Sequence, residues 1–191
     1  MKKKGKQSRS RQTIQTILDA ATQVLIDQGY SRATTNRIAE KSGFSVGTLY
    51  QYFENKEDVY RELVSYELGK IVAVVQEAPV HDNLRDTLTA IITRILQLFG
   101  NDPMLMQALG QLTAGPFLEI RSVARAQTVA GVAALLHAHR EEITVQDLYL
   151  AADTLVSATE GFAVNANTTS YPASDLLEQG LRLQLAYLTM P

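Results

Sequence analysis

Residues 46–52, Val-Gly-Thr-Leu-Tyr-Gln-Tyr, combine small side chains with groups that donate and accept hydrogen bonds. If this stretch is helical, Leu49 and Phe53 share one face, because residues four apart lie together on a helix. The opposite side carries Val46, Gly47, Thr48, Tyr50 and Gln51. Hydroxyl and amide groups can bond to base edges or phosphates, methyl groups can contact thymine, and glycine lets the backbone approach closely. The pattern favours non-covalent recognition of duplex DNA.

Two short helices and a tight turn must position this stretch. Apolar residues at helical spacing predict a first helix from Arg11 to Asp27. N-capping residues predict a second from Thr35 to Ser42 and a third from Val46 to Phe53. Only the segment Gly43-Phe44-Ser45 separates the last two. Two short helices joined by such a glycine-containing turn form a helix-turn-helix, whose second helix enters the major groove.

The remaining chain is also expected to be helical, because no alternation strong enough for a sheet is present. Further helices are predicted at about residues 56–75, 84–99, 103–112, 115–139, 144–167 and 172–190. The expected fold class is all-α, with about nine helices. Residues 1–55 would form a basic tail and helix-turn-helix DNA-binding domain. Residues 56–191 would form a helical effector-binding and dimerisation domain, with helix 56–75 as the connector.

Charge is distributed unevenly along the chain. The net charge is -2, yet residues 1–61 carry 11 basic and six acidic side chains, a local +5 that leaves -7 for the rest. A basic end on an acidic body suggests contact with a polyanion, although a solvated extension has the same composition. We expect the tail residues Lys2, Lys3, Lys4 and Lys6 to raise affinity for DNA of any sequence.

Composition and motifs argue against several other functions. The chain has no cysteine, which excludes disulfides and thiolate sites and fits a reducing cytoplasm. No apolar stretch approaches the ~18 residues that a membrane span requires. His81, His137 and His139 are expected at the surface or in a pocket lining, and serines such as Ser45 are expected to act as helix caps. We therefore predict no catalytic residue, metal site or cofactor.

The segment ATTNRIAEKSGFSVGTLYQYFENKEDVY resembles the signature of the tetracycline-repressor (TetR) family. The similar stretch runs roughly from Ile14 to Leu63. The resemblance implies base-edge contacts from Gly47, Thr48 and Tyr50. It implies phosphate contacts from Thr35, Ser45, Gln51, Tyr52 and Lys56. Val46 stands where family members often carry Lys or Pro, so one backbone contact would be missing there.

The resemblance further implies a homodimer formed by the helices near 144–167 and 172–190. Two insertion helices related by a dyad would bind a palindromic operator. A repressor of this kind is released by a small-molecule effector, which the sequence does not identify. Residues that could line its site are Phe99, Met104, Gln107, Gln111, Phe117, Thr159, Glu160 and Phe162.

Two other classes of function remain open from the sequence. One is an enzyme or carrier that uses the helical body, with the helix-turn-helix only structural. The other is a regulator that responds to a protein or activates transcription. Of these classes, we predict the DNA-binding repressor and not an enzyme.

Overall fold

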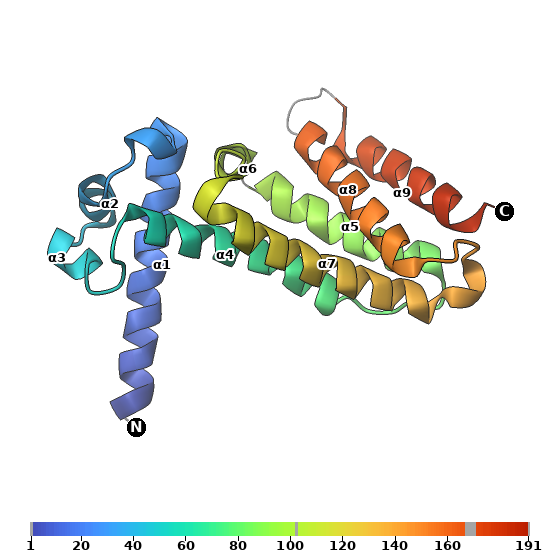
Figure 1. Ribbon diagram of the computed structural model, residues 1–191, viewed down its shortest axis with the longest axis horizontal. Coiled ribbons are helices and arrows are strands. Elements are labelled where there is room, and N and C mark those ends of the chain that lie inside the picture. Colours follow the sequence, from blue (N-terminus) through green and yellow to red (C-terminus); the bar gives the residue numbers. More distant parts are fainter. Residues whose placement is uncertain (1, 102, 167–170, 191) are drawn as a thin grey trace. The chain divides into compact units, whose positions relative to one another are not determined.

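The computed structural model describes residues 2–101, 103–166 and 171–190, and every regular element in these ranges is helical. The elements shown in Figure 1 are α1 Lys2–Gln28, η1 Tyr30–Arg32, α2 Thr35–Ser42, α3 Val46–Leu49, α4 Lys56–Gln76, α5 Leu84–Asn101, α6 Pro103–Leu109, η2 Gly115–Phe117, α7 Leu118–Ala138, η3 Arg140–Glu142, α8 Leu148–Ala166 and α9 Ala173–Thr189. The predicted all-α class with about nine helices is confirmed for this part of the chain.

Two helix ends near the N-terminus differ from the prediction. α1 begins at Lys2 and not at Arg11, because a polar, basic segment has no apolar period from which a helix start could be inferred. α3 ends as an α-helix at Leu49 and not at Phe53. The next residues tighten into a turn in which the Gln51 and Tyr52 amides bond to carbonyls three residues back, at 3.1 and 3.0 Å.

The helix near 144–167 also starts later than expected, because the capping residue is Asp147. Its Oδ1 accepts the amides of Tyr149 and Leu150, both at 3.0 Å. Thr144, where the predicted range begins, lies before the helix and donates its hydroxyl to the Leu188 carbonyl at 3.1 Å. Thr144 thus ties the end of α9 to the segment before α8.

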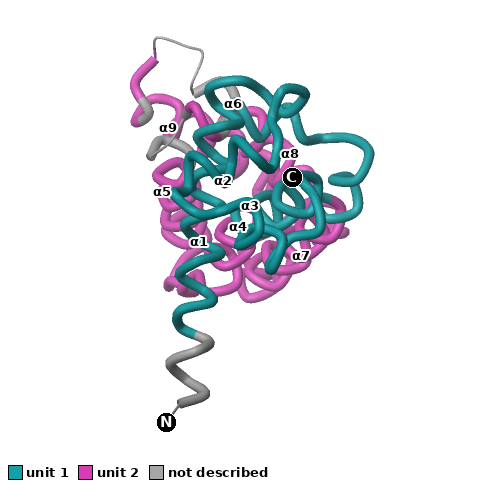
Figure 2. Tube along the Cα trace, turned by 90° about the vertical axis from the view of Figure 1, so that its left-hand side faces the viewer, with its two compact units in different colours: residues 1–67, 107–121 teal, residues 68–106, 122–191 magenta. Residues whose placement is uncertain are grey.

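The chain forms two compact units (Figure 2). Unit 1 contains the residues up to Glu67 together with Gln107–Arg121, and unit 2 contains Leu68–Met106 and the residues from Ser122. The division falls inside α4, α6 and α7. The functional boundary between residues 55 and 56 stays a prediction.

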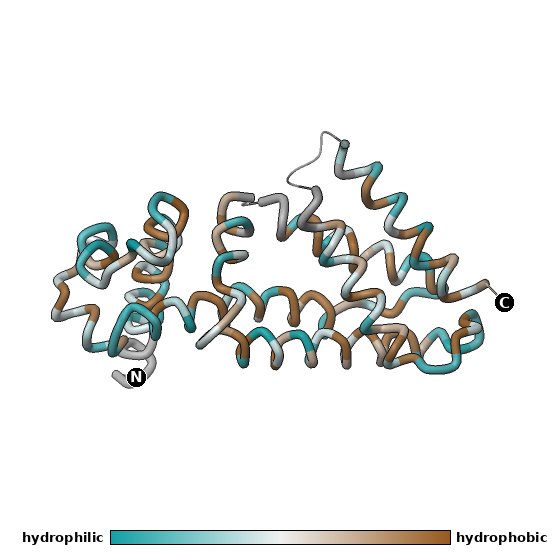
Figure 3. Tube along the Cα trace, turned by 45° about the horizontal axis from the view of Figure 1, so that its top comes forward, coloured by the Kyte–Doolittle hydropathy of each residue, from teal (hydrophilic) through white to brown (hydrophobic). Residues whose placement is uncertain are grey.

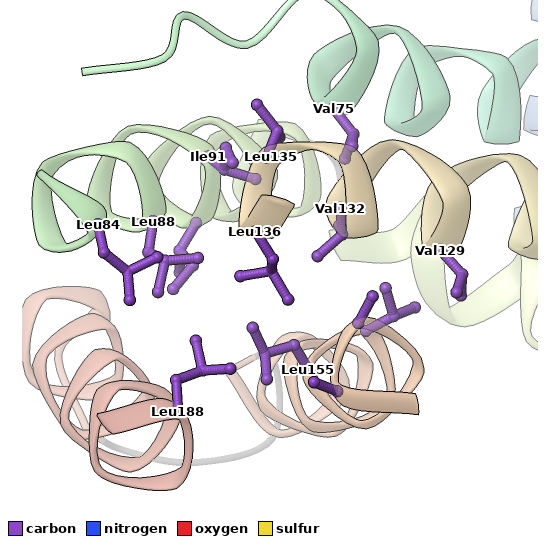
Figure 4. Packing of buried hydrophobic residues seen from close by; sticks show 14 of the residues in the cluster. Val75, Leu84, Leu88, Ile91, Val129, Val132, Leu135, Leu136, Leu155 and Leu188 are labelled. Carbon is purple, nitrogen blue, oxygen red and sulfur yellow. The ribbon is translucent and has the colours of Figure 1, made fainter. Parts of the chain in front are cut away.

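Unit 2 is held together by a continuous aliphatic interior. Hydrophobic and hydrophilic residues alternate along its helices (Figure 3), as amphipathic helices around one core require. Figure 4 shows Leu88, Leu136, Leu155 and Leu188, from four different helices, converging on this interior. α4 and α7 approach so closely that a Cβ added at Gly131 would lie 2.7 Å from Val75 Cγ1.

One expectation about the histidines is wrong. His139 is buried, with only 6% of its surface exposed. Its Nε2 lies 2.9 Å from Thr87 Oγ1, and its Nδ1 lies 3.0 Å from Glu142 Oε1. Packing of η3 against the start of α5 creates this site, and no local sequence pattern reports such a long-range contact.

Candidate nucleic-acid interface

The turn between α2 and α3 is built by caps on both sides. Thr34 caps α2, its Oγ1 accepting the Arg37 amide at 3.3 Å. α2 ends at Gly43, whose φ of 73° lies in the left-handed region that glycine adopts without steric cost. Ser45 caps α3, its Oγ accepting the Thr48 amide at 3.0 Å. The capped turn sets the direction in which α3 leaves α2.

The inner face of this region anchors α3. Leu49 is fully buried and Phe53 retains 6% exposure, and Ile38 of α2 is also fully buried. Gly47 and Gln51 are exposed, and Tyr50 is 53% exposed. The predicted division into an anchoring face and an outward face is therefore present.

Several of the predicted DNA-contacting residues are brought together by hydrogen bonds. The hydroxyls of Thr35 and Tyr50 lie 3.2 Å apart and join the start of α2 to the residue after α3. The hydroxyls of Ser45 and Thr48 lie 2.9 Å apart. Polar groups from both helices thus gather on one surface of unit 1. Val46 and Tyr52 are half-buried beside them.

Lys56 has an additional role that sequence reasoning missed. Its Nζ donates to the carbonyls of Tyr30 and Ala33, at 3.0 and 3.1 Å. It also lies 4.5 Å from the centre of the Tyr30 ring. The ammonium group therefore holds the segment between α1 and α2, and its predicted phosphate contact would use its remaining hydrogen-bonding capacity.

Two tyrosines of unit 1, the buried Tyr60 and the half-buried Tyr30, have raised pKa values. Tyr60 is fully buried and donates its hydroxyl to the Ala21 carbonyl at 3.2 Å. Burial raises the pKa of Tyr60 well above its ordinary value, since the phenolate would lose its hydration, and Tyr30 adds to the rise. Burial, with a smaller effect from Glu57, also raises the pKa of Tyr30. Both groups stay neutral and act in packing.

The predicted effector-lining residues are divided between the two units. In unit 1, Gln107 and Gln111 are exposed and Phe117 is buried. In unit 2, Met104 is 56% exposed, and the other described members are Thr159, Glu160 and Phe162. The side chain of Phe99 lies outside the described residues. No single unit gathers the whole set, so this site stays a prediction.

The predicted residues in unit 2 have structural partners. Thr159 Oγ1 accepts from the buried Gln184 at 2.8 Å. Glu160 accepts from Arg125, also at 2.8 Å. Phe162 packs on Gly180, where an added Cβ would lie 3.4 Å from the ring. These contacts join α8 to α7 and α9.

The side chains of Thr87, His139 and Glu142 are linked in the same sequence of contacts as the nucleophile, base and acid of a hydrolase triad. The Thr87 hydroxyl, however, is not accessible to a substrate. Thr87 is only 1% exposed, and its hydroxyl already accepts the His81 amide at 2.9 Å. Glu142 Oε1 also accepts the Leu84 amide at 2.9 Å. The three side chains therefore hold the start of α5.

Within the described ranges, no three metal-ligating residues cluster, and none of the helices has the length and apolarity of a membrane span.

Unit 1 also contains a groove of about 670 Å³ between α1 and α2. Its lining residues are Val24, Asp27, Gln28, Arg32, Arg37, Glu40 and Lys41. Lys41 pairs with Asp27 at 3.5 Å, and Arg37 donates to Gln28. The groove is thus a charged surface with one ion pair, and it contains none of the predicted effector residues.

A short helix that follows a capped glycine turn, packs on α2 and keeps polar groups on its outer side forms a helix-turn-helix, the motif of a class of DNA-binding proteins. The model of the family "bacterial regulatory proteins, tetR family" matches residues 17–63, so this segment is similar to the members of that family. The fatty acid metabolism regulator protein of Bacillus subtilis (strain 168) is 30% identical over 87 residues, which span 45% of each chain. The match thus covers less than half of that relative's length.

Two solved structures share the fold over nearly the whole chain. The fatty acid degradation regulator FadR from Bacillus halodurans has a TM-score of 0.78 at 23% identity, covering 90% of this chain and 94% of that one. FadR from Bacillus subtilis, solved with stearoyl-CoA, has a TM-score of 0.78 at 21% identity, covering 91% and 98%. At these identities the likeness establishes the fold alone.

Proposed function

We propose that this protein is a TetR-type transcriptional repressor that binds a palindromic operator as a homodimer and is released by a small-molecule effector. The observation that carries the proposal is the exposed surface formed by the start of α2 and by α3, where the Thr35 and Tyr50 hydroxyls meet. The polar side chains on this surface point away from the core of unit 1 and are therefore available to contact DNA.

The proposed contacts are of two kinds. Gly47, Thr48 and Tyr50 approach base edges, with Val46 beside them against thymine methyl groups. The residues Thr35, Ser45, Gln51, Tyr52 and Lys56 contact phosphates. Base contacts carry sequence information, whereas phosphate contacts fix the position of the protein on the duplex.

Exposed apolar side chains on the last two helices support the homodimer. Tyr149 and Leu150 of α8 are 56% and 58% exposed, and Leu183 of α9 is 54% exposed. Large apolar side chains that are exposed on two neighbouring helices favour a covered interface. A two-fold axis through α8 and α9 would present two α3 helices to half-sites about 34–36 Å apart.

A fatty acyl thioester is the proposed class of effector. The B. subtilis FadR structure contains stearoyl-CoA, and this chain shares its fold. The proposed release is a two-state equilibrium, in which the effector favours a conformer whose two α3 helices no longer match the half-site spacing. An effector with a ~100-fold preference for that conformer shifts the equilibrium by ~2.7 kcal/mol.

The test begins with selection of binding sites from random duplex DNA by the full-length protein. We expect an inverted repeat, a stoichiometry of two chains per site, and release on addition of stearoyl-CoA but not of free CoA. Absence of any selected sequence would contradict the repressor function. A selected sequence that stearoyl-CoA leaves bound would contradict only the acyl effector class.

A further inference from the structure

The segment Gln107–Arg121 belongs to the same compact unit as the DNA-binding helices, although residues 68–106 separate it from them along the chain. We call it the brace segment. It is closed on itself by Arg121, whose guanidinium donates to the carbonyls of Leu112 and Leu109 at 2.7 and 2.8 Å. The brace segment therefore has a defined conformation of its own.

Three contacts attach the brace segment to the elements around the helix-turn-helix. Phe117 packs edge-to-face on Tyr30, with ring centres 5.3 Å apart. Arg61 of α4 donates to the Pro116 carbonyl at 3.1 Å. At Gly29 an added Cβ would lie 3.1 Å from Gln111 Oε1, so this side chain lies against the turn before η1.

Tyr30 is surrounded on several sides. Tyr60 packs on it edge-to-face, with ring centres 5.3 Å apart, and Lys56 lies over its ring. Phe117, which is 3% exposed, packs on the same ring from the brace segment. Aromatic pairs in this geometry have a preferred relative orientation, so the contact fixes direction as well as distance.

The position of Tyr30 is transmitted to the DNA-binding surface over a short stretch of chain. Tyr30 begins η1, and the Ala33 carbonyl at the end of η1 is bound by Lys56. Thr34 then caps α2, and Thr35 pairs with Tyr50. A shift of the Tyr30 ring would therefore move the start of α2 and the residues next to α3.

We propose that Phe117 is a positioning residue for the DNA-binding helices, which acts through the Tyr30 ring to set how α2 and α3 are presented. This inference rests on the proposed DNA-binding function. It also gives the brace segment, which contains the predicted effector residues Gln107 and Gln111, a direct physical connection to the operator-binding surface.

The first test is amide hydrogen exchange on the full-length protein without DNA. Phe117→Leu removes the ring and keeps an apolar side chain. We expect it to speed exchange in Thr35–Phe53 by about tenfold, and to leave α5 and α8 unchanged. Leu112→Ala is the matched control, because Leu112 is fully buried in the same segment but has no ring. Equal exchange of Thr35–Phe53 in both variants would overturn the proposal.

The second test compares affinity for the selected operator with affinity for random DNA. Phe117→Leu and Tyr30→Leu should each lower the ratio of specific to random affinity. The double variant should lower this ratio no further than Tyr30→Leu alone, because Tyr30→Leu already removes the ring that Phe117 contacts. Tyr30→Phe keeps the rings and should keep the ratio. If Phe117→Leu does not fold, the two Tyr30 variants make the same comparison.

The outcomes separate the two proposals. An unchanged ratio in a folded Tyr30→Leu or Phe117→Leu protein would overturn the positioning role. If the unaltered protein selects no DNA sequence, the proposed function fails. Hydrogen exchange then still decides whether Phe117 orders α2 and α3.

Discussion

Unit 1 and unit 2 differ in where their informative side chains lie and in how far along the chain the contacts reach that position them. In unit 1 the functional candidates face outward, and short-range caps such as Ser45 with Thr48 position them. In unit 2 the informative contacts face inward, and they join residues as distant in sequence as Leu84 and Leu188. A recognition surface built from local contacts is visible in a sequence, whereas an interior built from long-range contacts is not.

The polar groups of unit 2 extend this comparison. Gln184 is 3% exposed and donates to Thr159, and His139 lies between Thr87 and Glu142. Buried polar groups are costly unless they are paired. These pairs therefore select one alignment of α8 with α9 and one position of η3 against α5.

The largest expected effect tests the close packing of unit 2. In Gly131→Ala the new methyl group would meet Val75 Cγ1, and the branched valine has little rotamer freedom to move away. We expect a loss of about 2 kcal/mol in the free energy of unfolding, measured by urea denaturation. Gly69→Ala is the matched control, because nothing lies within 4 Å of an added Cβ there. That variant should gain about 0.5–1 kcal/mol, and equal destabilisation of both would contradict the close approach.

The next effect belongs to the interior of unit 1. The unfolded chain releases the Tyr60 proton near the ordinary pKa of about 10, whereas the folded chain retains it at higher pH. The stabilisation is therefore complete below about pH 10, and it declines by up to ~1.4 kcal/mol per pH unit above that value. Denaturation between about pH 9 and 12 should show this decline. Tyr60→Phe should flatten this decline, and an unchanged decline in that variant would contradict the assignment to Tyr60.

A third effect concerns the surface of unit 1. Tyr50→Ala should weaken binding to the selected operator about tenfold or more and leave binding to random DNA nearly unchanged, because base contacts carry specificity. Tyr50→Phe removes only the hydroxyl that contacts Thr35. Comparison of the two variants therefore distinguishes the contribution of the hydroxyl from that of the ring. Equal losses on both DNAs would remove Tyr50 from the recognition set. Fluorescence anisotropy with labelled duplexes measures both affinities.

The smallest expected effect concerns the basic start of the chain. Deleting residues 2–10 removes Lys2, Lys3, Lys4, Lys6 and Arg9. The slope of log affinity against log salt should become shallower by ~0.9 for every phosphate that these side chains neutralise, with no change in sequence preference. An unchanged slope would assign these residues to a solvated extension.

Much of unit 1 was predictable because its signals are local. Thr34, Gly43 and Ser45 mark the ends of α2 and α3 by types and spacing that follow from backbone hydrogen bonding and glycine's left-handed φ. The anchoring roles of Leu49 and Phe53 follow from helical periodicity. The early start of α1 was missed, because its first residues contain no such periodicity.

The sequence by itself determined the helical class, the capped turn and the outward group of small and hydrogen-bonding residues, because each depends on neighbours within one or two helical turns. Only the tertiary structure decided that His139 is buried, that Lys56 binds two carbonyls, and that Phe117 packs on Tyr30. These contacts join segments that are distant along the chain. Their formation depends on how whole helices pack, and periodicity and composition do not encode that packing in any local pattern.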